Sequence, residues 1–295
     1  MRIVRSAPSE PVPPGEHHDP RANPSRANFF GRGRRLIDGL LAAAFAVAAP
    51  SRCAGCRREL PLRGLYDLLP RLCRECREAA IGPVGERCRR CAAPVGPFLG
   101  NRPDCSLCRR DRFHFESVIR LGVYEGRLRE MCLAAKRPGC EELAAALAET
   151  LFVEEGLDLL AAQAEAIVPV PHHWSEAFLG PPKTPETLAS VLSRRLRVRM
   201  ATSILAKSRR TLKQSSLPST RRRVNLRTAF RVPGRFASQV AGRRILLVDD
   251  VLTTGATADE AARALLDAGA ASVRVVVIAR CVGLKPLAGR AGTSR

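Results

Sequence analysis

The chain has 295 residues, of which 49 are Lys or Arg and 28 are Asp or Glu, for a formal net charge of +21. Such a positive charge favours polyanionic ligands, including nucleic acid, phosphorylated metabolites and anionic lipid. Only 4% of the residues are aromatic, which argues against a single-strand reader built from stacking platforms. The length allows one or two domains with a substantial core.

The N-terminal region divides into two parts. Residues 1–33 are rich in Pro, Arg, Ser and His, so we expect them to be disordered. The apolar run at 36–49 follows a basic flank and superficially resembles a secretory signal, but Asp38 interrupts it and cysteine pairs of the metal-binding kind follow. We therefore predict a helix over 34–50 that is too short to span a bilayer, in a cytoplasmic protein.

Eight of the 11 cysteines form four C-x-x-C pairs within residues 51–112. This spacing is typical of Zn²⁺ sites, because a tight turn then presents two thiolates to a tetrahedral ion. Closed Cys₄ sites have a structural role, and they indicate a reducing compartment. Interleaved pairing and an iron–sulfur cluster are the alternatives. Pairing neighbours gives two zinc sites, one from Cys53, Cys56, Cys73 and Cys76 and one from Cys88, Cys91, Cys105 and Cys108.

Beyond residue 112, strand-like and helix-like segments alternate. This alternation predicts an α/β domain with a doubly wound parallel sheet over 113–282, followed by a flexible tail at 283–295. The expected strands are 117–124, 166–171, 243–250 and 272–280, and the expected helices are 128–163, broken at Pro138–Gly139, 185–198 and 256–270.

The stretch ILLVDDVLTTGAT (245–257) places two adjacent acids, Asp249 and Asp250, at the end of a buried strand. In open α/β sheets, ligands bind beyond the carboxyl ends of the strands. The backbone N–H groups and hydroxyls that follow can hold a phosphate, and Gly255 permits the backbone angles that this requires. A 5-phosphorylated ribose has both a phosphate and vicinal hydroxyls. A Thr-capped helix with two solvated acids is less favoured, since burying adjacent acids without a partner costs desolvation energy.

This stretch resembles the diphosphoribosyl-binding loop of type I phosphoribosyltransferases. With the cysteine pairs ahead of it, the chain resembles the ComF family over roughly 35–282, a family associated with competence and DNA uptake. The resemblance implies a double zinc ribbon at 51–112 and a phosphoribosyltransferase-like fold that binds phosphoribosyl diphosphate with Mg²⁺. It implies that Asp249 and Asp250 hold the ribose, and that the 5-phosphate is held by Thr253, Thr254, Gly255, Ala256 and Thr257.

Three further segments carry the resemblance. IVPVP (167–171) is similar to the strand and loop on the diphosphate side of the family's site. Lys136, in YEGRLREMCLAAKRPG, matches a retained cation of the family. The stretch 211–230 is similar to the mobile loop that closes over the site, with Gln214, Arg222 and Asn225 at the matching positions.

The chain departs from the family pattern at two places. Family members carry R-G-F-N-Q after the P-V-P segment, whereas the aligned stretch here is GPPKT (180–184). Purine-salvage relatives place a carboxylate where Thr253 stands, so a salvage reaction of that kind is less favoured. The sequence therefore names neither a catalytic residue nor an acceptor for a glycosyltransferase reaction.

No acid occurs between Glu186 and Asp249, and this interval is rich in Arg. Its basic side chains would attract a diphosphate or a DNA backbone equally. Two hypotheses follow, a phosphoribosyltransferase-like binder or enzyme and a non-catalytic platform for single-stranded DNA or DNA-uptake proteins. The basic residues between 207 and 244 are Lys207, Arg209, Arg210, Lys213, Arg221, Arg222, Arg223, Arg227, Arg231, Arg235, Arg243 and Arg244.

Overall fold

A computed structural model describes most of the chain after residue 50. The described residues are 51–60, 71–83, 85–95, 105–109, 111–171, 184–208 and 228–282. The disordered segment and helix predicted before residue 51, and the tail predicted after 282, lie outside them. Residues Pro50–Arg295 form one compact unit that contains both the cysteine pairs and the sheet. The boundary at 112/113 stays a prediction.

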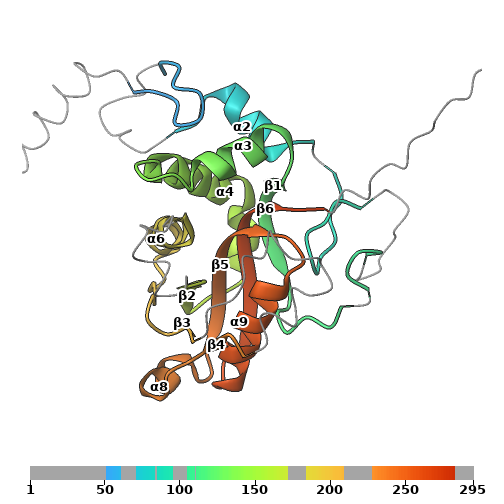
Figure 1. Cartoon of the computed structure of the whole chain (residues 1–295), viewed down its shortest axis with the longest axis vertical. Helices are drawn as coiled ribbons and strands as arrows, with labels where there is room; N and C mark the ends of the chain where they lie inside the picture. The colour runs from blue at the N-terminus through green and yellow to red at the C-terminus, as the bar shows by residue number, and fades with distance from the viewer. Residues whose placement is uncertain are drawn as a thin grey trace, which may run out of the picture. The chain divides into compact units, whose positions relative to one another are not determined.

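The centre of this unit is a four-stranded sheet in the order β1-β6-β5-β2 (Figure 1). All three neighbouring pairs are parallel, which confirms the predicted parallel α/β fold. The β5 strand is interior because its run from Ile245 to Val248 is buried on both faces and accepts a neighbour on each side. The strands are β1 (Val118–Val123), β2 (Ala166–Pro169), β5 (Arg244–Leu252) and β6 (Ser272–Arg280).

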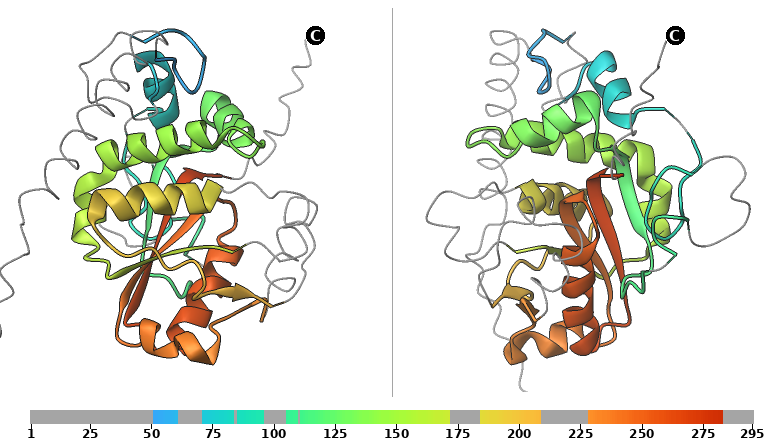
Figure 2. Two further views of the ribbon diagram at one scale, coloured as in Figure 1. Left: turned by 90° about the vertical axis from the view of Figure 1, so that its left-hand side faces the viewer. Right: turned by 45° about the vertical axis from the view of Figure 1, so that its right-hand side comes forward.

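Helices cover both faces of the sheet and create two apolar cores. Leu246 and Val248 of β5 join the core formed with α3 (Gly126–Ala134), α4 (Glu141–Ala161) and α6 (Thr184–Leu196), whereas Ile245 and Leu247 join the core formed with α9 (Ala256–Asp267). This alternation is the period of two that a strand imposes on its side chains. Figure 2 shows α4 and α6 side by side on one face.

The helix break predicted at Pro138–Gly139 lies between α3 and α4, where Gly139 has a φ of 77°. A second kink, at Glu155 within α4, was not predicted, although the neighbouring Gly156 weakens the helical pattern there. Smaller elements were also not predicted. They are α2 (Arg74–Ile81), the antiparallel pair β3 (Ala206–Lys207) and β4 (Phe230–Arg231), η2 (Gly234–Phe236) and α8 (Ala237–Val240).

None of the helices in the described ranges combines the length and the apolar character needed to cross a bilayer.

Candidate functional site

The two adjacent acids lie near the carboxyl end of β5. Asp249 pairs in register with Val277 of β6, and both acids are partly exposed. Their side chains accept hydrogen bonds from the next backbone N–H along the chain, at 2.8 Å for Asp249 Oδ1 and 2.6 Å for Asp250 Oδ1. Because successive strand residues face opposite ways, Asp250 lies on the α3 side of the sheet and Asp249 on the α9 side.

Lys136 forms an ion pair with one acid of this pair. It lies between α3 and α4, and its Nζ is 2.6 Å from Oδ2 of Asp250. Burial opposes the charge on Lys136, but Asp250 and then Asp249 hold the pKa of this lysine above its usual value. The buried hydroxyl of Thr184, at the start of α6, donates to the carbonyl of Ala135 at 3.2 Å and so fixes the neighbouring backbone.

Asp249 is the acid left without a cation. Within the described part of the chain, no basic side chain forms an ion pair with it. Burial, and then the neighbouring Asp250, raise the pKa of Asp249 to about 8. Among the residues that the structure describes, the acid pair has one carboxyl group more than it has ion-paired cations, a balance that suits a metal ion or a set of hydroxyl donors.

The segment after β5 turns sharply into α9. Gly255 has a φ of 82°, in the left-handed region, and α9 begins at Ala256 without any side-chain cap. A Cβ on Gly255 would lie 3.0 Å from Cε1 of Phe113, so both the angle and the neighbour require glycine. Thr253 is exposed, whereas Thr254 and Thr257 are partly buried.

The N–H groups of this turn are available to a ligand. Among the described residues, no carbonyl or side chain accepts from the N–H of Thr254 or Gly255, and that of Ala256 has a 3.4 Å contact with Oγ1 of Thr254. The first N–H groups of a helix also lack partners within the helix. Loop and helix end together have the donor arrangement expected of an anion cradle, and they follow directly on the two acids.

The predicted diphosphate segment lies beside the same strand. In β2, Pro169 is in register with Val248, and the N–H of Val170 donates to the Val248 carbonyl at 2.8 Å. The end of β2 therefore borders the acid pair. Of the GPPKT stretch, only Thr184 lies within the described residues.

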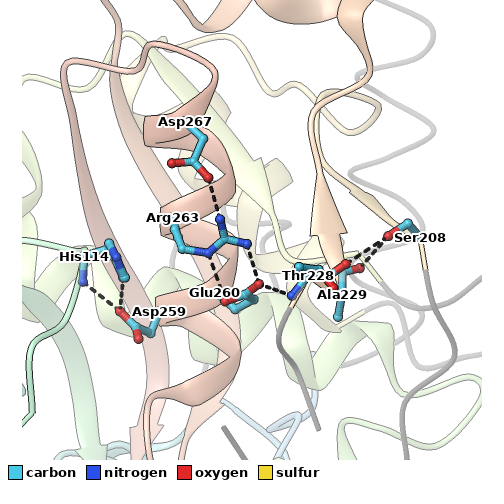
Figure 3. A network of polar contacts seen from close by, with 8 residues as sticks. All are labelled: His114, Ser208, Thr228, Ala229, Asp259, Glu260, Arg263 and Asp267. Carbon is cyan, nitrogen blue, oxygen red and sulfur yellow. Dashed lines mark hydrogen bonds and ion pairs between the residues drawn. The ribbon is translucent and has the colours of Figure 1, made fainter. Parts of the chain in front are cut away.

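A polar network joins α9 to the β3–β4 hairpin and to the segment before β1 (Figure 3). Asp259 accepts from both the N–H and Nδ1 of His114, at 2.7 and 2.9 Å. Glu260 accepts from the N–H of Thr228 and from Arg263. Although burial opposes ionisation, Arg263 and Thr228 hold the pKa of Glu260 below its usual value.

This network anchors the two ends of the predicted mobile loop. Ser208 donates its N–H to Ala229 at 2.8 Å, and its hydroxyl contacts the carbonyls of Thr228 and Ala229, both at 3.3 Å. The predicted loop residues Gln214, Arg222 and Asn225 lie between these ends and outside the described residues.

The eight paired cysteines form two clusters of four. The structure brings together neighbouring pairs, Cys53, Cys56, Cys73 and Cys76 in the first cluster and Cys88, Cys91, Cys105 and Cys108 in the second, so the interleaved pairing is not the one adopted. Within each cluster the sulfur atoms all lie within 4.8 Å of one another.

The first C-x-x-C pair of each cluster has the same turn. The residue after its second cysteine has a positive φ, 64° at Arg57 and 54° at Ala92. Its N–H donates to the carbonyl of the first cysteine, Cys53 or Cys88, at 2.8 and 2.9 Å. Repeated geometry of this kind is what two equivalent metal-binding turns require.

The sulfur spacing fits a tetrahedral thiolate site. With a Zn–S bond of about 2.3 Å, the edges of a tetrahedron of sulfurs are about 3.8 Å. The distances are 3.7 Å for Cys56–Cys73 and Cys88–Cys108, 3.6 Å for Cys91–Cys105 and 3.8 Å for Cys105–Cys108. A disulfide would need about 2.05 Å, so these are thiol clusters of a size suited to Zn²⁺.

The sequence analysis did not single out two buried arginines and two phenylalanines that lie near the second cysteine cluster or the turn after β5. Arg120 of β1 and Arg280 of β6 are 8% and 6% exposed. Phe113 and Phe115 stack with ring centroids 4.5 Å apart, beneath Gly255. A charged residue ending the apolar run SVRVVVIAR was the one available clue to Arg280.

The parallel sheet with helices on both faces is a phosphoribosyltransferase-like α/β fold. The sequence matches that domain family over residues 170–289.

Relatives of the chain have names that refer to DNA utilization and competence. The chain is 29% identical over 247 residues to the DNA utilization protein YhgH of Escherichia coli O6:H1, covering 79% of this chain and 99% of the relative. It is 33% identical over 116 residues to competence protein F of Haemophilus influenzae, covering 39% and 50%. These relatives, the domain and the two Cys₄ clusters confirm the resemblance to the ComF family.

Among solved structures, the glutamine phosphoribosylpyrophosphate amidotransferase from B. subtilis, complexed with ADP and GMP, is similar at 19% identity and a TM-score of 0.32. The similarity covers 50% of this chain and 30% of that one.

Proposed function

We propose that this protein binds phosphoribosyl diphosphate, or a related ribose phosphate, together with Mg²⁺, at the carboxyl end of β5. Asp249 and Asp250 would hold the ribose hydroxyls, and the turn from Thr253 to Thr257 would hold the 5-phosphate. The observation that carries the proposal is the direct succession of an acid pair and an uncapped, N–H-rich turn.

Charge balance supports this assignment. Lys136 compensates Asp250, whereas Asp249 has no ion-pair partner among the described residues. A ribose diol donates hydrogen bonds to carboxylates, and bound Mg²⁺ would add positive charge and neutralise the diphosphate. Either group would stabilise the ionised form of Asp249 and so lower the raised pKa of that carboxyl.

The chain's own residues contribute binding and electrostatics. The turn from Thr253 to Thr257 contains no carboxyl group that could accept a proton from a nucleobase attacking the sugar. A transfer reaction here would depend on stabilising positive charge that develops at the sugar carbon, a role that two nearby carboxylates fit.

We place this binding activity in DNA utilization or competence, since the names of the relatives refer to those processes. The second candidate function is a non-catalytic platform for single-stranded DNA or for DNA-uptake proteins. The stretch without acids from 187 to 248 favours it, because its cations would attract a polyphosphate backbone.

Calorimetry on the full-length, zinc-loaded chain with phosphoribosyl diphosphate and Mg²⁺ tests the main proposal. The variant Asp249→Asn with Asp250→Asn should weaken binding by about tenfold or more while still folding and melting cooperatively. Asp267→Asn is a matched control, since it removes an exposed acid on α9 away from the turn. Equal affinity of the wild type and the double variant would refute the ribose site.

Salt dependence tests the DNA platform. Affinity for single-stranded DNA should fall linearly on a log–log plot against salt concentration, and charge reversal at Arg221, Arg222 and Arg223 should reduce the slope. A slope near zero would exclude phosphate-backbone binding. If the protein binds single-stranded DNA but not phosphoribosyl diphosphate, the non-catalytic DNA platform is the better assignment of its function.

A further inference from the structure

The second cysteine cluster contacts the turn from Thr253 to Thr257 through the buried side chain of Arg280. Nε of Arg280 donates to the carbonyl of Cys91 at 2.9 Å. Nη1 of the same guanidinium donates to the carbonyl of Leu252 at 3.1 Å and also to that of Thr253. One arginine therefore joins a metal-ligating residue to the last residue of β5 and the first residue of the turn.

These contacts determine the direction of the turn's N–H groups. A peptide unit is planar and trans, so its N–H points opposite to its C=O. Because the carbonyl of Thr253 faces Arg280, the N–H of Thr254 faces away from it. The same argument applies to the carbonyl of Leu252 and the N–H of Thr253. Arg280 thus orients donors of the anion cradle without contacting the anion.

Apolar packing strengthens the same connection. Phe113 packs on the apolar surface of the second cluster, together with Val95 and Val282. The ring of Phe113 also lies directly against Gly255, as the 3.0 Å distance to a built Cβ shows. The second cluster therefore reaches the turn at two points, at Gly255 through Phe113 and at Thr253 through Arg280.

The charge of Arg280 points to the cluster as its counter-ion. Within the described ranges its hydrogen-bond partners are the carbonyls of Cys91, Leu252, Thr253 and Cys281, and no carboxylate there forms an ion pair with it. A buried cation without a counter-charge is costly. Four thiolates around Zn²⁺ carry a net charge of −2, and Cys91 is one of them.

We propose that Arg280 is a positioning residue that couples the second Cys₄ cluster to the ribose-phosphate site, so that an intact cluster is required for high affinity. The inference rests on the proposed function, since it assigns the turn to the 5-phosphate. It gives the two clusters different roles, because the first packs against α3, with Gly55 close to Met131, and makes no described contact with the turn.

Arg120 is a matched control for Arg280. It is similarly buried, and its Nε donates to the carbonyl of Ala92, one residue after Cys91. It makes no described contact with Leu252 or Thr253. Arg120→Met therefore removes a buried cation and an equivalent bond to the cluster without removing a bond to the turn.

The experiment compares Arg280→Met, Arg280→Lys and Arg120→Met in the full-length chain, by zinc content, hydrogen exchange of the 252–257 amides and calorimetry with phosphoribosyl diphosphate and Mg²⁺. Arg280→Met should speed exchange at 252–257 and weaken binding by about tenfold, with two zinc ions retained. Arg280→Lys, which keeps the charge but loses the planar fork, should fall between Arg280→Met and the wild type. Arg120→Met should match the wild type in both measurements.

Equal exchange and equal affinity in Arg280→Met and Arg120→Met would overturn the coupling. If Arg280→Met does not fold, the comparison of Arg280→Lys with the wild type decides, since wild-type exchange and affinity in that variant would refute the proposal. If the wild type does not bind phosphoribosyl diphosphate, the proposed function fails. The exchange measurement then still decides whether the cluster orders the turn.

Discussion

The Nζ of Lys136 lies 2.6 Å from Oδ2 of Asp250, although the two residues are far apart in the sequence. The contact brings the segment between α3 and α4 to the carboxyl end of β5. Among the described residues it pairs one carboxylate of the two with a cation, and it gives the proposed ribose-phosphate site a testable pH dependence.

Replacing Lys136 by Met should shift that dependence to higher pH. Below its pKa of about 8, Asp249 is mostly protonated, and a ligand that needs its carboxylate must displace that proton. The affinity of the wild type should therefore rise with pH and level off above pH 8. Lys136 lowers the pKa of Asp249, so its loss moves the rising part of the curve upward. Calorimetry from pH 6 to 9 measures this, and Lys136→Arg should retain the wild-type profile. Identical profiles for Met and Lys at 136 would contradict the assigned contact.

Asp249→Asn should stabilise the fold, and increasingly so as pH rises. The folded-state pKa of Asp249, about 8, is above its unfolded value near 3.8, so the folded state binds more protons between these values and wild-type stability falls as pH rises through this window. Asparagine removes this loss and still accepts from the N–H of Asp250. We expect a gain in unfolding free energy that grows by roughly 3–4 kcal/mol between pH 5 and pH 8. Denaturant titrations at these two pH values provide the measurement, and a gain independent of pH would show that Asp249 is ionised throughout.

Gly255→Ala should destabilise the protein more than Gly242→Ala does. Both glycines have a positive φ, 82° and 70°, where a Cβ costs about 1–2 kcal/mol. At Gly242 no atom lies within 4 Å of the added Cβ, whereas at Gly255 the ring of Phe113 is 3.0 Å away. The difference in unfolding free energy between the two variants therefore isolates the contact between the turn and the aromatic pair. Equal losses would mean that Phe113 moves aside without cost.

Local signals were sufficient to predict the sheet and its acid pair. The run from Ile245 to Val248 is apolar at every position, which indicates a strand covered on both faces, and the two acids follow immediately. Gly255 marks the turn because a positive φ is easily reached by glycine alone. The four C-x-x-C spacings predicted the cysteine clusters because the two cysteines of each turn are close together in the sequence.

Contacts that depend on tertiary packing could not be read from the chain. In the sequence, Arg280 looks like any charged residue at the end of a strand. Its role depends on the pairing of β6 with β5 and on its contact with the carbonyl of Cys91. Thr184 falls in a stretch that the family comparison treated as a departure, yet its hydroxyl fixes the backbone next to Lys136. The β3–β4 hairpin is two residues long on each side, too short to produce a periodic pattern.

The metal content of the clusters gives the last prediction. Two Zn²⁺ ions per chain are expected by elemental analysis, with neither iron nor the visible absorbance of an iron–sulfur cluster. Replacing Cys53 and Cys56 by Ser, or Cys88 and Cys91 by Ser, should each remove one zinc, because the clusters share no ligand.

Both variants should melt at lower temperature than the wild type, since structural zinc contributes directly to folding. Only the second should speed exchange of the 252–257 amides, because only the second cluster reaches Leu252 and Thr253 through Arg280. Loss of both zinc ions from either variant would show that the clusters fold as one unit, and recovered iron would replace zinc as the native metal.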